Sequence, residues 1–144
     1  MVKPSVRAQP LIAVRNVQSS SRWYAQLLGG EGLGGGSDHD HVYDRLLCQG
    51  SLVLQLHAWD EEDHPNLVGA DRAPVGHGVL VWFEVGDFDA AVARARAMKV
   101  VVIEEPHVNA GPRHREIWLR DPDGYLVVLA SPDGEATADH RART

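Results

Sequence analysis

Apolar positions in the first half of the chain follow a strand-like run, then a helical spacing, then further strand-like runs. Residues 11–17 are mostly apolar and predict a strand. Apolar pairs four positions apart within 23–28 predict a helix, which serines at 19–21 can cap. A tight turn at Gln49-Gly50 predicts a hairpin. The three strands after the helix are expected within 30–36, where the pattern is weak, and at 42–48 and 52–58.

The second half of the chain repeats this order. A strand is expected at 79–85 and a helix at 88–98, with Asp87 as its cap. β-Branched residues at 100–103 predict the next strand. The last two strands are expected at 115–120 and 125–130, joined by a turn at Asp121-Pro122-Asp123-Gly124.

The two halves also match in register. Val14 and Val85 each precede a helix and are 71 residues apart, and Leu54 and Val127 in the last strands are 73 residues apart. Offsets this close predict an α+β fold made from one duplicated unit. Two half-sheets with helices outside form a cup, which is a place for a ligand. We expect one domain over 1–131, with modules at about 9–60 and 78–131, a linker at about 61–77 and a disordered tail at 132–144.

Composition narrows the classes of function. The 144-residue chain has a formal net charge of −6 and scattered basic residues, so no nucleic-acid partner is expected. No apolar run reaches the roughly 18–20 residues of a membrane span, so no membrane partner is expected either. The single Cys48, and residues 1–9 without a secretory pattern, predict a cytoplasmic protein.

Two sequence signatures, one in each half, resemble those of a known superfamily. The first half contains Val14-Arg15-Asn16-Val17, Ser20, Trp23-Tyr24 and Leu27-Leu28-Gly29. The second half contains Asp121-Pro122-Asp123-Gly124-Tyr125. Over roughly residues 9–131 these resemble the vicinal oxygen chelate superfamily, which includes glyoxalase I, bleomycin-resistance proteins and extradiol dioxygenases. The resemblance implies paired βαβββ modules in a curved eight-stranded mixed sheet, a cup with its helices outside, commonly within a homodimer.

The resemblance also implies where metal-dependent relatives place their four ligands. Those positions correspond to Gln9, Gln55, Leu80 and Val128 of this chain. Some glyoxalases use Gln at the position of Gln9, but Leu80 and Val128 offer no donor atom, and neutral amides are weak ligands alone. No metal or other cofactor is therefore expected.

Strand alternation predicts which side chains line the cup, because residues two apart share a face. Trp82 can stack on a planar or cationic ligand, with a place in the core as the alternative, and Glu84 can pair with a positive charge. Glu84 and His57 are also candidates for a general acid and base, with solvated strand ends as the alternative. The predicted ligand-binding residues are Gln9, Ala13, Gln55, His57, Leu80, Trp82, Glu84, Trp118 and Val128, although the sequence does not fix which face carries Trp118.

Two further polar groups have less specific patterns. Asp38, His39, Asp40 and His41 are suitable metal ligands, but they follow a glycine run, and a solvated loop is the simpler interpretation. Other basic residues flank Gly111-Pro112, in a loop that often closes over the ligand in relatives. A role at the rim of the ligand site and a plain surface position are the two interpretations of these residues, which are His107, Arg113, His114 and Arg115.

The favoured function is metal-independent binding or sequestration of a small organic compound, cationic or aromatic, as in bleomycin-resistance proteins. One alternative is a lyase, isomerase or dioxygenase that uses a divalent metal (Ni, Zn, Fe or Mn). Its ligands would have to come from His57, Glu84, His114 or residues 38–41. A binding module without activity of its own, acting as a regulator or partner domain, is a third possibility.

Overall fold

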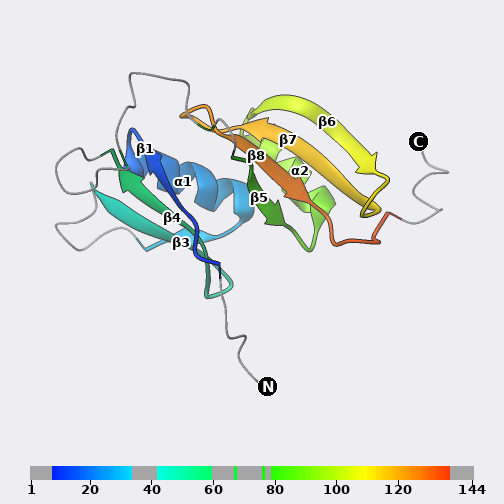
Figure 1. Ribbon diagram of the computed structural model, residues 1–144, viewed down its shortest axis with the longest axis horizontal. Coiled ribbons are helices and arrows are strands. Elements are labelled where there is room, and N and C mark those ends of the chain that lie inside the picture. The colour runs from blue at the N-terminus through cyan, green and yellow to red at the C-terminus, as the bar shows by residue number, and fades with distance from the viewer. Residues whose placement is uncertain (1–7, 34–41, 60–66, 68–75, 77–78, 137–144) are drawn as a thin grey trace. The chain divides into compact units, whose positions relative to one another are not determined.

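A computed structural model describes residues 8–33, 42–59, 67, 76 and 79–136 of the chain (Figure 1). The chain divides into two compact units, Met1–Arg72 and Ala73–Thr144. Each unit contains one βαβββ module.

The first module is a four-stranded mixed sheet with one helix. Its strands lie in the order β1-β4-β3-β2, with β1 parallel to β4 and the other neighbours antiparallel. The weak glycine-rich pattern does contain a strand, β2, although it has only two residues. The elements are β1 (Leu11–Val14), α1 (Val17–Leu28), β2 (Glu31–Gly32), β3 (Tyr43–Cys48) and β4 (Ser51–Ala58).

The second module repeats this topology. Its strands lie in the equivalent order β5-β8-β7-β6, with β5 parallel to β8. The elements are β5 (Val81–Glu84), α2 (Phe88–Ala97), β6 (Val101–Asn109), β7 (His114–Arg120) and β8 (Leu126–Ala130). The predicted α+β fold of two βαβββ modules is confirmed, with the eight strands arranged as two four-stranded sheets.

One face of each sheet is covered by the helix of its own module. Ser21 of α1 donates a hydrogen bond to buried Asp44 of β3, and the Arg115 guanidinium of β7 lies 4.8 Å from the centre of the Phe88 ring of α2. Burial of aliphatic side chains on these faces is the main stabilising contribution. Leu54, Leu56, Ile117, Leu119, Val127 and Leu129 are fully buried there. We call the opposite side of each sheet its helix-free face.

The helices begin and end at recognisable caps. The Asn16 side chain accepts a hydrogen bond from the Ser19 amide at 2.8 Å, so Asn16 caps α1 and the prediction of a serine cap at 19–21 is wrong. Asp87 caps α2 as predicted, accepting from Ala90 at 3.0 Å. Gly29 ends α1 in the left-handed conformation that glycine favours. No helix among the described residues is long and apolar enough to cross a membrane.

Strand β6 is longer than the sequence predicts. The expected strand covered 100–103, whereas β6 continues through Pro106 to Asn109. Proline is tolerated here because β6 is an edge strand, and its pairing with β7 shifts register twice between Val102 and His107. The extension places Glu104 and His107 in the sheet.

Residues 132–136, which the sequence assigns to a disordered tail, make defined contacts with the second module. Ala136 is buried, and its amide donates to the Arg113 carbonyl at 3.0 Å. Glu135 forms an ion pair with Arg115 at 2.6 Å, and Asp133 lies 3.2 Å from His114. The polar composition of this segment indicated disorder. Composition does not reveal that its acidic residues have basic partners on β7. Residues 137–144 lie outside the described part of the chain.

Candidate functional site

The helix-free face of the second module carries two rows of side chains that cross the sheet from β5 to β6. Strand register places one residue from each strand in each row. The first row contains Trp82, Val128, Trp118 and Glu104. The second row contains Glu84, Ala130, Glu116 and His107. Since neighbouring strands lie about 4.8 Å apart, the two tryptophan backbones are about 10 Å apart with Val128 between them.

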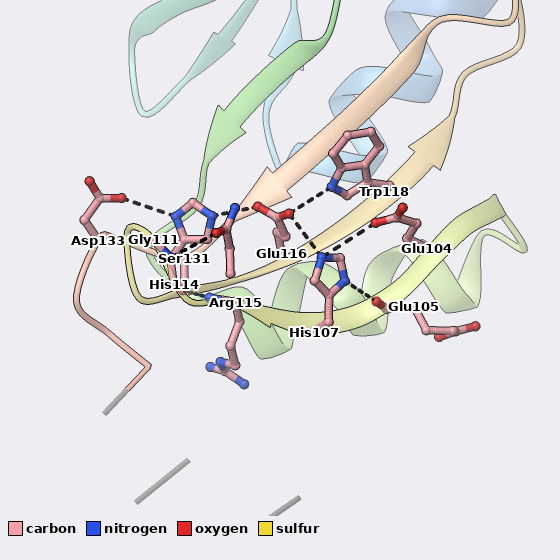
Figure 2. A network of polar contacts seen from close by, with 11 residues as sticks. Glu104, Glu105, His107, Gly111, His114, Arg115, Glu116, Trp118, Ser131 and Asp133 are labelled. Carbon is pink, nitrogen blue, oxygen red and sulfur yellow. Dashed lines mark hydrogen bonds and ion pairs between the residues drawn. The ribbon is translucent and has the colours of Figure 1, made fainter. Parts of the chain in front are cut away.

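Glu116 is the centre of a hydrogen-bonded network on this face (Figure 2). One carboxylate oxygen lies 2.7 Å from His114 Nε2, and the other lies 3.1 Å from His107 Nε2 and 3.2 Å from Trp118 Nε1. The Glu116 residue is only 4% exposed. A buried carboxylate is tolerated when several donors satisfy it, and here His114, His107, Trp118 and Asn109 do so. We call Glu104, His107, His114, Glu116 and Asp133 the Glu116 cluster.

Each histidine of the Glu116 cluster has an acceptor at both ring nitrogens. His114 Nδ1 lies 3.2 Å from Asp133 Oδ1, opposite its contact with Glu116. His107 Nδ1 lies 2.8 Å from the Glu105 carbonyl oxygen, opposite its own contact with Glu116. A carbonyl and an ionised carboxylate can only accept, so both nitrogens must carry hydrogen for all four contacts to form. The geometry therefore favours the imidazolium form of both rings.

The pKa values of the cluster shift in the directions that this charge pattern requires. Burial alone would raise the pKa of Glu116, but the side-chain hydrogen bonds from His114, Trp118, His107 and Asn109 outweigh it and lower the pKa. Burial would lower the pKa of His114, but Glu116 and Asp133 raise it overall. The Glu105 carbonyl and the Glu116 carboxylate raise the pKa of His107. The charged forms of all three groups are thus mutually stabilised.

Trp82 is an exposed aromatic side chain beside this cluster. The residue is 44% exposed, so it is not part of the core. Its ring centre lies 5.7 Å from that of His114, with the two planes at 51°. Glu84, two residues along β5, is exposed on the same face. An accessible indole therefore lies beside buried and exposed charges.

The helix-free face of the first module is more neutral. The Gln55 amide oxygen accepts from the Tyr43 hydroxyl at 2.5 Å, and its NH₂ donates to the Gln9 carbonyl at 2.8 Å. Ala13 pairs with His57, whose Nδ1 lies 2.7 Å from the Ala58 carbonyl. The hydrogen bonds of Gln55 therefore hold the N-terminal segment beside the sheet.

The side chains at the four family metal positions do not fit a divalent ion. Gln55 already uses its amide oxygen for Tyr43, Val128 is fully buried, and Leu80 is an exposed aliphatic residue. Two amides and two aliphatic side chains lack the anionic or imidazole donors that such sites need. Within the described ranges no group of three or more His, Cys, Asp or Glu side chains could hold a metal ion.

The structure groups some of the predicted site residues and separates others. Trp82, Trp118 and Val128 share one row, which settles the face that carries Trp118. Glu84 lies in the neighbouring row. His57 lies in β4 of the first unit, so its predicted acid–base role with Glu84 stays a prediction. Residues 38–41 lie outside the described ranges.

The sequence interpretation missed Glu116, the central residue of the cluster. The signal was present, because His114, Glu116 and Trp118 alternate with the fully buried Ile117 and Leu119. The predicted loop around Gly111-Pro112 is instead a tight turn between two strands. The side chains of His107 and His114 lie on the helix-free face. Arg115 lies on the opposite, helix-covered face, where it pairs with Asp89 and Glu135.

Comparisons with known proteins agree with this fold. Residues 7–129 match the model of the Glyoxalase/Bleomycin resistance protein/Dioxygenase superfamily. No curated protein matches the chain. TioX from Micromonospora sp. ML1 is 15% identical, with a TM-score of 0.68 over 88% of this chain and 98% of that protein.

Two further solved structures have the same fold. Lactoylglutathione lyase from Agrobacterium tumefaciens is 17% identical, with a TM-score of 0.64 over 93% of this chain and 98% of that one. The fosfomycin resistance protein FosX from Listeria monocytogenes is 14% identical, with a TM-score of 0.62 over 96% and 99%. With the family match over most of its length, this chain belongs to the Glyoxalase/Bleomycin resistance protein/Dioxygenase superfamily.

Proposed function

We propose that this protein binds and sequesters a small organic compound, cationic or aromatic, without a metal ion. The observation that carries the proposal is the exposed Trp82 indole in one row with Trp118 on the helix-free face. Accessible aromatic faces with a few polar groups are typical of sites for organic ligands. An indole that stacks on a cation contributes about 0.5–2 kcal/mol.

The charges on the same face favour a cationic ligand. Glu84 is exposed at the end of β5, and the Glu104 side chain is 52% exposed at the far end of the Trp82 row. Carboxylates pair with a cationic group of a ligand, whereas Arg120, two residues after Trp118 on β7, already donates to the Gly124 carbonyl at 2.8 Å. We therefore propose that the ligand is an aromatic compound with a positive group. We propose separately that the protein is a cytoplasmic homodimer.

Binding without bond chemistry accords with the state of the histidines. A general base needs a ring nitrogen with a free lone pair, but His107 and His114 have both nitrogens in hydrogen bonds to acceptors.

The superfamily description includes bleomycin resistance proteins, and FosX is named a fosfomycin resistance protein. Protection against a small toxic compound would be in keeping with both.

A metal-dependent lyase, isomerase or dioxygenase is the rival function. The lactoylglutathione lyase among the similar structures is the comparison that favours it. Elemental analysis of protein purified without chelator separates the two proposals. Stoichiometric Ni, Zn, Fe or Mn would overturn metal-independent binding.

A thermal-shift panel of aromatic antibiotics and polyamine-bearing compounds tests the binding function itself. We expect at least one aromatic cation to stabilise the protein, and Trp82→Ala to weaken its binding by about tenfold. Trp23→Ala is the matched control, because Trp23 lies on α1 of the first module and is not part of the Trp82 row. Its ring centre lies 4.8 Å from that of Tyr24. A flat response across the panel, or equal loss of binding in both variants, would contradict the proposal.

A further inference from the structure

His107 occupies a place between two carboxylates that suits a cationic group of a ligand. Its Nε2 lies 3.1 Å from Glu116 Oε1 and 3.6 Å from Glu104 Oε2. The ring is held at its other nitrogen by the Glu105 carbonyl. We infer that the His107 imidazolium is a built-in occupant of a cation subsite, and that an amidinium or ammonium group of the ligand displaces it. This inference rests on the function proposed above and specifies the charge of its ligand.

The exposure of these groups supports exchange with a ligand. The His107 side chain is 38% exposed and Glu104 is 52% exposed, whereas Glu116 behind them is buried. His107 and Glu104 lie at the β6 ends of the two rows, and Trp118 pairs with Glu104 in the ladder. A ligand stacked on the tryptophan row can therefore place a cationic group against Glu104.

The charged groups around His107 come from several elements. On β6 they are Glu104 and Glu105, and the Glu105 carboxylate is paired with Arg96 of α2 at 2.7 Å. From β7, Glu116 faces His107 directly, and His114 lies behind Glu116 with Asp133 of the C-terminal segment. Glu84 of β5 stands in the same row as His107. Carboxylates outnumber imidazoliums on this face, so the loss of the His107 proton leaves a local negative excess.

Competition between a proton and a ligand cation makes binding depend on pH. Below the pKa of His107, the ligand must displace a bound positive charge. Above that pKa, His107 is neutral and no longer offsets the charges of Glu104 and Glu116, so these carboxylates attract the ligand cation more strongly. If binding displaces one proton, the dissociation constant should fall about tenfold for each pH unit until the pKa is passed.

The test uses two probes with the same aromatic core. DAPI carries two amidinium groups that can pair with carboxylates, and phenylindole is its uncharged parent. Isothermal titration between about pH 5.5 and about pH 8.5 covers the range in which histidine titrates. We expect the DAPI dissociation constant of the wild-type protein to fall about tenfold per pH unit and then level off. Phenylindole should bind with an affinity that does not change with pH.

Substitutions test whether His107 is the group that makes DAPI binding depend on pH. His107→Gln keeps a hydrogen-bond donor without the charge, and it should bind DAPI tightly at every pH. Lys99→Gln removes one positive charge from an exposed position after α2 and should keep the wild-type pH profile. Glu104→Gln, an exposed substitution that should fold normally, should weaken DAPI but not phenylindole.

The possible failures are distinguishable. The His107 inference alone would be overturned if the wild-type protein bound DAPI equally at every pH. It would also be overturned if the DAPI dissociation constant of His107→Gln depended on pH as in the wild type. If neither probe bound at any pH, the proposed aromatic ligand and this inference would both be wrong.

Discussion

The Trp82 indole lies against the imidazole of His114, with 5.7 Å between ring centres and 51° between the planes. His114 is itself buried and bonded to Glu116 and Asp133. The exposed aromatic surface of the second module is therefore in contact with its buried charges. A change in protonation below the surface must change the environment of the indole above it.

Tryptophan fluorescence should report this contact. A protonated imidazole quenches a neighbouring indole, and the pKa of His114 is raised. We expect emission to increase as the pH rises through that raised value, and the increase to disappear in Trp82→Phe. An identical increase in the Trp82→Phe variant would show that another tryptophan is responsible.

Stability should be highest between the titration of Glu116 and that of the histidines. His107 and His114 have raised pKa values, so their contribution is complete below the unfolded-state histidine pKa of about 6.5 and is lost as the pH rises through the folded-state values. Glu116 has a lowered pKa, so its contribution is present above about 4.3 and is lost as the pH falls through its folded-state value. Urea midpoints between about pH 3 and about pH 9 measure this profile. A midpoint that kept rising up to about pH 9 would contradict these signs.

Removing the Glu116 charge should destabilise the protein. Glu116→Gln leaves two imidazoliums without the carboxylate between them, and we expect a loss of roughly 2–4 kcal/mol of unfolding free energy. The pKa of His114 should fall at the same time, which NMR titration can detect. Glu105→Gln is the control, because the Glu105–Arg96 pair is exposed and should contribute little. Equal effects of the two substitutions would mean that Glu116 contributes no more than a surface ion pair does.

Two glycines in exposed or edge segments should respond oppositely to alanine. A Cβ at Gly32 would overlap the Ser21 hydroxyl and lie 2.7 Å from Asp44 Oδ2, so Gly32→Ala should cost about 1–3 kcal/mol. A Cβ at Gly86 would meet no atom within 4 Å, so Gly86→Ala should be neutral or slightly stabilising. Thermal midpoints of the two variants measure the difference. A neutral Gly32→Ala would show that Ser21 and Asp44 can move aside.

The turn between β7 and β8 should depend on a single carboxylate oxygen. Asp121 Oδ1 accepts from the amides of Asp123, Gly124 and Tyr125 at 2.8–2.9 Å. Asp121→Ala removes this acceptor from a buried position and should cost roughly 2–4 kcal/mol. Asp121→Asn keeps an acceptor oxygen and should recover part of the loss. If Asp121→Ala unfolded at the same denaturant concentration as the wild-type protein, the Oδ1 contacts would not stabilise the turn.

The module order could be predicted because local patterns and tertiary packing agree. The turns at Gln49-Gly50 and at residues 121–124 each contain a glycine that specifies the turn by backbone preference, and Gly50 and Gly124 do adopt positive φ values of 79° and 105°. The cap at Asn16 was missed because asparagine and the later serines are all suitable caps, and only the position of β1 decides between them.

The candidate site was less predictable than the fold. Trp82, Glu84 and Val128 were identified from alternation or from the family resemblance, whereas Trp118 was named without a known face. The strand register places all four on one face. The Glu116 cluster was missed because it depends on pairing between β6 and β7. Pro106 concealed the second half of β6, and the phase of β7 was not fixed. Long-range register is what brings His107 to Glu116.

The extension of β6 also affects how this molecule can associate with others. An uncovered edge strand can template a further strand from a neighbouring chain, which leads to ribbons and aggregates. Pro106 removes an amide donor from β6, the adjacent glutamates add like charges, and the register shifts interrupt the ladder. Strand addition at this margin is therefore disfavoured.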